Sequence, residues 1–237
     1  MTAISDTGGE APECCERSMA LLRACTNASA SVFYRVNREL QGFEYISFNL
    51  PAESYNDYMN LFSRYDPLHP RFHDDAKLSY LPISEVETDR NTQQFRRFMD
   101  RYGLTDMVEI FFRNDGHIRA GATLIRQGGR FRPADLKELS RVLPYVEFVI
   151  TTFYLPRLKA EQTGLQARFG LTDREMDILY LLRSGAANKD IANNLQISLA
   201  TVKTHMQHIF QKTGTSNRTE VLSEVFLGPR SPAPAPG

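Results

Sequence analysis

The spacing of hydrophobic residues changes once along this chain, near residue 170, and that change most constrains the fold. Before it, aromatic and β-branched runs alternate with segments of helical spacing. From Leu171 to Leu227 the apolar residues recur only at the 3.6-residue period of an α-helix. A chain of 237 residues is long enough for two small domains. The sequence therefore predicts a mixed domain followed by an all-helical one.

The first block, residues 13–158, is predicted to be an α+β sensor domain, an antiparallel sheet flanked by helices. Ser31–Val36 and Phe43–Leu50 are aromatic and β-branched, which predicts a hairpin. Met107–Arg113 and His117–Arg126 flank an Asp-Gly turn, which predicts a second hairpin. Helical spacing covers four further segments, Ser18–Ala28, Ala52–Tyr65, Thr92–Tyr102 and Pro133–Phe153.

Composition predicts the flanks and the connection between the blocks. Residues 228–237 alternate proline with small residues and cannot form a helix or a core, so we expect a disordered tail. Residues 1–12 are predicted to be a disordered start. Pro156 to Gly170 reads as a linker with partial helical character, and we place its limits at 159–170. The last domain then spans residues 171–227.

Charge, cysteines and hydropathy exclude several classes of protein. The 28 basic residues balance 28 acidic ones, which neither requires nor excludes a nucleic-acid partner. No apolar run approaches the ~20 residues needed to span a bilayer, and the first residues lack a secretory signal. Three cysteines, Cys14, Cys15 and Cys25, indicate free thiols in a reducing compartment, so we expect a cytoplasmic protein without a membrane partner.

Sites for catalysis, metals and cofactors are not predicted. His69, His73 and His117 are scattered, and Pro70 argues against a helix that would place the first two on one face. The chain lacks a G-x-S-x-G motif and a glycine loop that could cradle phosphate. We therefore expect no enzyme activity, no metal and no cofactor.

The last block contains the pattern of a helix-turn-helix. Thr172 is expected to cap its first helix, with Glu175 as the capping-box partner. Asn188 is expected to cap a short helix over Lys189–Leu195. Ser198 then caps a longer helix that extends to Thr213, and a last helix runs from Ser216 to Leu227.

One face of the longer helix has the chemistry of DNA recognition. Val202, Met206 and Ile209 fall on a stripe that must face inward. From Ser198 to Lys212 the segment contains no acidic residue. Lysine can reach guanine, glutamine adenine, and threonine offers a hydroxyl or a methyl in the major groove. The opposite stripe carries Thr201, Lys203, Thr204, Gln207, His208 and Gln211.

Residues 171–220 resemble the LuxR-type (also NarL/FixJ-type) helix-turn-helix. The matching pieces are Leu171-Thr172 with Arg174-Glu175, Gly185 with Asn188-Lys189-Asp190-Ile191-Ala192, Ile197-Ser198, Thr201-Val202-Lys203-Thr204-His205 and Asn217-Arg218. The resemblance implies a four-helix domain that binds double-stranded DNA as a homodimer on a two-fold symmetric operator. It implies that Lys203, Thr204 and Gln207 face the bases. It places Asn188, Lys189, Thr201, His208 and Arg218 near the DNA backbone or at the helix ends.

The first block carries a candidate pocket for a small ligand. Tyr55, Tyr58 and Asp66 lie close together in the sequence, so that hydroxyls directed inward and a carboxylate that accepts a hydrogen bond can line an apolar pocket. We add Tyr45 and Phe111 as candidate lining residues. The stretch resembles the acyl-homoserine-lactone-binding domains of quorum-sensing LuxR regulators, but it lacks their tryptophans. The whole block is similar to PAS- and GAF-like sensors. A lactone, another small ligand, or no ligand at all remain open alternatives.

The segment Pro133–Phe153 carries a long apolar stripe. Such a stripe either packs on the sheet or pairs with a second copy, and we favour the pair because half-site binding requires a dimer. The sequence thus predicts a LuxR-type transcription regulator gated by its first domain through a ligand or a partner. The alternative is a protein-interaction module, an anti-activator of another regulator with little DNA binding of its own, since the last block is near neutral.

Overall fold

The computed structural model of the protein describes residues 13–37 and 39–227. The predicted disordered start, 1–12, and tail, 228–237, lie outside the described residues. The chain divides into two compact units, Met1–Arg157 and Leu158–Gly237. Within the described ranges, no helix has the length and apolar content needed to cross a bilayer.

The first unit is built on an antiparallel sheet of five strands in the order β2-β1-β5-β4-β3. Both predicted hairpins are confirmed, β1 with β2 and β4 with β5. The strands are β1 (Ala30–Val36), β2 (Gly42–Phe48), β3 (Tyr80–Pro82), β4 (Asp106–Asn114) and β5 (His117–Arg126). The short edge strand β3 was not predicted, because three residues ending in proline are too few to show the two-residue period.

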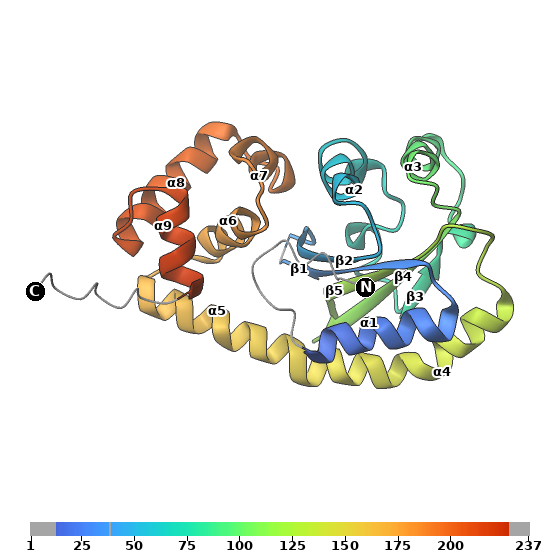
Figure 1. Ribbon diagram of the computed structural model, residues 1–237. Helices are drawn as coiled ribbons and strands as arrows, with labels where there is room; N and C mark the ends of the chain where they lie inside the picture. The colour runs from blue at the N-terminus through green and yellow to red at the C-terminus, as the bar shows by residue number, and fades with distance from the viewer. Residues whose placement is uncertain (1–12, 38, 228–237) are drawn as a thin grey trace, which may run out of the picture. The chain divides into compact units, whose positions relative to one another are not determined.

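Helices cover both faces of this sheet (Figure 1). One face carries α1 (Glu13–Thr26), α4 (Pro133–Val149) and the π-helical turn η5 (Ile150–Tyr154), with α1 and α4 side by side. The other face carries α2 (Ala52–Asp57) and α3 (Arg90–Arg101). After α2 the chain continues through a π-helical turn η1 (Tyr58–Phe62) and a 3-10 turn η2 (Ser63–Tyr65). The single helix predicted over Ala52–Tyr65 is therefore three short pieces. Further 3-10 turns are η3 (Pro70–Phe72) and η4 (Ile83–Glu85).

The apolar stripe of α4 and η5 packs inside the first unit. Its buried members are Leu139, Leu143, Val146 and Ile150, each at most 3% exposed. The expectation that this stripe pairs with a second copy is wrong for these residues, because the sheet and α1 already cover them. Three aromatic side chains nearby are exposed instead, Tyr145, Phe148 and Phe153.

The second unit is a small helical bundle (Figure 1). Its helices are α6 (Asp173–Arg183), α7 (Asn188–Asn194), α8 (Leu199–Thr213) and α9 (Arg218–Leu222), which continues into η6 (Ser223–Leu227). The predicted linker is helical, because α5 spans Leu155–Phe169. Asn188 was expected to cap α7 but is its first residue. The Asp190 carboxylate instead accepts the N–H of Ala187 at 3.1 Å, and Ala187 is the N-cap.

Candidate DNA-binding face and ligand pocket

Local signals in the sequence position helix α8. The Ser198 hydroxyl accepts the N–H of Thr201 at 3.0 Å, as predicted for an N-cap. Gln196, just before it, has a left-handed φ of 53°, which keeps the turn after α7 short. Gly214 ends the helix with a φ of 67°, a conformation that glycine adopts without steric cost.

The two stripes of α8 divide as the sequence predicts. Val202, Met206 and Ile209 are buried in the bundle. All six residues of the polar stripe are exposed, namely Thr201, Lys203, Thr204, Gln207, His208 and Gln211. The helix therefore presents uncharged donors and acceptors with one lysine, Lys203, to the surface of its unit. Such a face can lie against base edges without repulsion between an acid and phosphate.

Three further residues that the sequence placed near DNA belong to the rest of the bundle. Lys189 is exposed and Asn188 is half-buried at the start of α7. Arg218 is turned toward the protein, and its guanidinium donates to the carbonyls of Ala186 at 3.0 Å and Leu182 at 2.8 Å. Arg218 thus supports the end of α6, where carbonyls have no helical partner.

A cavity lies in the first unit between the sheet and the layer of α2, η1 and α3. It encloses about 600 Å³ between protein atoms, open solvent at its mouth included. Its floor consists of alternate residues of four strands, which share one face of the sheet. These are Val32 and Tyr34, Tyr45 and Ser47, Met107 and Glu109, and Thr123 and Ile125. The cover supplies Ser54, Tyr55, Tyr58, Asp66, Leu68, Phe95 and Phe98.

Four of the five predicted ligand residues line this cavity: Tyr45, Tyr55, Tyr58 and Asp66. Phe111 does not line it. It is 1% exposed and its ring lies 5.4 Å from that of His73. Phe111 lies two residues beyond the cavity residue Glu109, so the predicted face of the sheet is correct but the position along the strand is not.

Two carboxyl groups are buried in the cavity wall. Asp66 accepts the Tyr58 hydroxyl at 2.7 Å and the N–H of Leu68 at 2.9 Å. Glu109 accepts the Tyr34 hydroxyl at 2.7 Å on one oxygen and the Thr123 hydroxyl at 2.7 Å on the other. Burial disfavours the charged forms, which raises the pKa of Asp66 to about 6 and that of Glu109 to about 8.

Sequence reasoning missed Glu109 and its partner Tyr34. The signal was present, since Glu109 is the single charged residue between Met107 and Phe112 in an apolar strand. Gly121 brings the pair together. A Cβ at Gly121 would lie 2.4 Å from the Tyr34 ring and 2.8 Å from a Glu109 oxygen. Only glycine therefore leaves room for Tyr34 to cross the sheet and reach Glu109.

Comparison with known proteins decides the family. The model described as bacterial regulatory proteins, luxR family, matches residues 170–225. The monoamine regulon transcriptional regulator of Klebsiella aerogenes is 36% identical over 199 residues, which cover 84% of each chain. This chain belongs to the LuxR family. Within that family, the CsgBAC operon transcriptional regulatory protein of Escherichia coli K12 is 51% identical over 53 residues, 22% of this chain and 24% of that protein.

The solved structures similar to this LuxR-family chain are distant in sequence. CepR2 of Burkholderia cenocepacia, described as an N-acylhomoserine lactone dependent LuxR-family factor, is 15% identical with a TM-score of 0.47. The match covers 62% of this chain and 89% of that one. The curated relatives are transcriptional regulators, and the chain is accordingly a DNA-binding regulator of the LuxR type.

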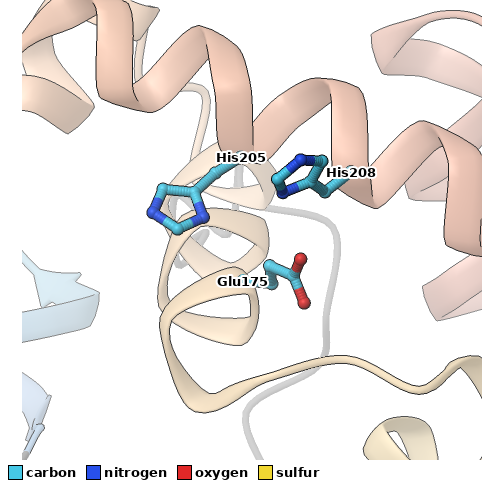
Figure 2. A group of neighbouring side chains, drawn as sticks. All are labelled: Glu175, His205 and His208. Atoms are coloured by element: carbon cyan, nitrogen blue, oxygen red, sulfur yellow. The ribbon is translucent and has the colours of Figure 1, made fainter.

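The LuxR-type domain also brings three potential metal ligands together. Figure 2 shows His205 and His208 on α8 beside Glu175 of α6. One ligand atom from each lies within 4.8 Å of the others. However, the Glu175 carboxylate accepts the N–H of Thr172 at 2.8 Å and the Lys212 ammonium at 2.7 Å. A positive charge already neutralises Glu175, and we therefore interpret the group as a capping network rather than a metal site.

Proposed function

We propose that the chain reads its operator with the exposed face of α8 and binds DNA as a homodimer. The observation that carries this proposal is the acid-free polar stripe of α8, exposed along its whole length. In the major groove, Lys203 would reach guanine and Gln207 adenine, with Thr204 beside them. The LuxR family pattern supports these roles.

The remaining residues of the site fix the helix on the DNA backbone. Lys189 is an exposed cation at the start of α7 that can contact phosphate. Thr201, His208 and Gln211 border the base-reading residues on the same helix. The described residues 171–227 balance acids and bases, so affinity depends on the joined half-sites of a dimer more than on net charge.

Dimerisation is proposed to use the exposed aromatic side chains of the first unit. Tyr145, Phe148 and Phe153 are 66%, 53% and 58% exposed, and the rings of Phe148 and Phe153 lie 5.6 Å apart. Aromatic side chains clustered on the surface are typical of protein interfaces. We call these three residues the aromatic patch.

We further propose that a small molecule in the cavity of the first unit controls DNA binding. The cavity is apolar with a few convergent polar groups, as binding sites for small molecules are. The Klebsiella aerogenes relative is named for a monoamine regulon. This supports control of genes for small-molecule metabolism by the present chain.

Selection of DNA from a random pool followed by a mobility-shift assay tests the DNA-binding proposal. Lys203→Ala combined with Gln207→Ala should abolish the specific shift, since each lost base contact costs about 1–3 kcal/mol. Lys137→Ala combined with Gln127→Ala is the matched control, because both side chains are exposed on the first unit. Equal binding by wild type and the α8 variant would contradict the proposed reading face.

The balanced charge of residues 171–227 favours one alternative, a regulator that acts by binding another protein. The same assay at low salt separates the two functions. Electrostatic contacts to phosphate strengthen as salt falls, so a DNA-binding protein must retain DNA there. Absence of any retention at low salt would favour the protein-interaction function.

A further inference from the structure

We propose that the cavity of the first unit binds a small organic amine as its ammonium ion, held by Asp66 and Glu109 and enclosed by aromatic rings. This inference rests on the proposed control by a small molecule and names its chemical class. It starts from the charge of the cavity wall. Asp66 and Glu109 line the cavity, whereas none of its described lining residues is lysine, arginine or histidine. Arg71 and His73 lie outside the lining and act on Asp66 only as nearby charges.

The buried position of Glu109 favours a cationic ligand over an uncharged one. It is 2% exposed in the middle of the sheet, and both oxygens accept hydroxyl groups rather than a cation. A buried carboxylate costs free energy unless a counter-charge compensates it, so Glu109 can ionise only when a cation lies beside it. An ammonium ion supplies that charge and three hydrogen-bond donors.

Binding then includes a proton transfer. Burial raises the pKa of Glu109 to about 8, so the empty cavity holds this carboxyl mainly in its neutral form at pH 7. When the ammonium ion enters, the Glu109 carboxyl gives its proton to solvent and becomes the carboxylate partner. Asp66, whose pKa is about 6, is already a carboxylate at pH 7. One proton therefore leaves for each amine that binds, and the net charge of the cavity does not change.

The aromatic walls suit the same ligand. The rings of Tyr34 and Tyr45 stack at 5.2 Å with an interplanar angle of 22°. Tyr45 lies 5.2 Å from Tyr55, and Tyr58 lies 5.7 Å from Phe98. Aromatic faces attract organic cations and also bury the hydrocarbon part of an amine.

Two other ligand classes fit this wall less well. An anionic ligand would meet two carboxyl groups and no base, which is unfavourable in a buried site. A neutral amide needs one acceptor, and Asp66 alone would provide it. The second carboxyl is what distinguishes an amine site from a site for a neutral acyl amide.

Calorimetry on the full chain tests the proposal with matched pairs of probes. Butylamine, hexylamine and 2-phenylethylamine are each compared with the alcohol of the same skeleton at pH 7. At least one amine should bind about thirtyfold more tightly than its alcohol. Its binding heat should differ between phosphate and MOPS buffers in the sense of proton release, since neither buffer is a primary amine. Alcohols that bind as tightly as every amine would overturn the proposal.

Glu109→Gln keeps the shape of the side chain and one accepting oxygen, but the side chain can no longer ionise. We expect it to weaken amine binding by about thirtyfold, to abolish proton release and to leave alcohol binding within about threefold. Glu85→Gln, at an exposed position of η4, is the control and should change neither affinity. A Glu109→Gln variant that binds amines as wild type does would overturn the assignment.

Native mass spectrometry and measurements of operator affinity distinguish failure of the amine site from failure of the proposed control by a small molecule. One outcome is a neutral molecule that is retained from the host and alters operator affinity. This result would contradict the proposal that the ligand is an amine, but it would leave control by a ligand intact. An amine that binds through Glu109 without changing operator affinity would support the amine site and overturn the control.

Discussion

At the scale of single residues, the cavity shows what sequence spacing can and cannot reveal. Tyr55, Tyr58 and Asp66 were predicted because they lie within twelve residues of one another in the sequence. Glu109 was not, because its partners Tyr34 and Thr123 come from other strands and their register is not visible in a local pattern. The close approach at Gly121 was hidden for the same reason.

The protonation of Glu109 predicts how stability depends on pH. Its pKa is raised by burial to about 8 in the folded chain, against an ordinary value of 4.5. Between these values the folded chain binds more protons than the unfolded one, so its free energy of unfolding falls as pH rises. The Glu109→Gln variant lacks this effect. Its free energy of unfolding should therefore rise relative to that of wild type by up to about 1.4 kcal/mol per pH unit within that window.

Urea unfolding followed by circular dichroism at pH 5.5, 7 and 8.5 measures this difference in the full chain without ligand. Asp66 and the buried His69 are present in both proteins, so their titration largely cancels in the comparison. A constant difference between wild type and Glu109→Gln across the three pH values would show that Glu109 titrates in its ordinary range.

At the scale of elements, strong local signals predicted both hairpins, α3 and the helices of the second unit. The capping box of Thr172 and Glu175 starts α6 as expected. The sequence pattern gave wrong or missing elements where tertiary contacts determine the local structure. The π-helical turns η1 and η5 keep helical spacing in the sequence, the edge strand β3 is too short, and α7 begins one residue earlier than predicted.

Glu175 links two elements of the second unit, which yields a prediction for their stability. Its carboxylate is buried and binds Lys212 at the end of α8 as well as Thr172 at the start of α6. Burial alone would raise the pKa of Glu175, but the hydrogen bonds from Lys212 and Thr172 outweigh it and lower the pKa. Glu175→Gln should therefore destabilise the bundle by about 1–3 kcal/mol.

Hydrogen exchange of residues 173–183 and 199–213, measured by mass spectrometry on the full chain, localises the effect. We expect faster exchange in both helices of Glu175→Gln. Glu138→Gln is the matched control, because Glu138 pairs with Arg141 on the surface and such pairs contribute little. Exchange that is unchanged in α6 and α8 would mean that the capping network does not stabilise the bundle.

At the scale of the whole molecule, the order of a mixed α and β unit and a helical DNA-binding unit was readable from the change in periodicity. The surface through which two copies of the chain would associate could not be read from the sequence. The buried stripe of α4 and the exposed aromatic patch alternate on one helical segment. The spacing of apolar residues predicted an apolar helical segment, but it did not show which side of that segment packs against the rest of the first unit.

Loss of the aromatic patch should separate the copies. Phe148→Ser combined with Phe153→Ser removes two exposed rings, and we expect the variant to sediment as a monomer at micromolar concentration. Operator affinity should fall as well, because the two DNA-binding domains are no longer joined when they bind the two half-sites. Phe72→Ser is the matched control, since Phe72 is 58% exposed on a different turn. A dimeric double variant would place the interface elsewhere.

The central claim is that α8 reads bases, and the affinity for a selected operator against a scrambled duplex of equal length tests it most directly. Gln207→Ala should weaken operator binding about tenfold or more and leave the scrambled duplex unaffected. Lys189→Ala should weaken both duplexes alike and reduce the salt slope by about one. Equal affinity of wild type for operator and scrambled DNA, unchanged by Gln207→Ala, would contradict the account.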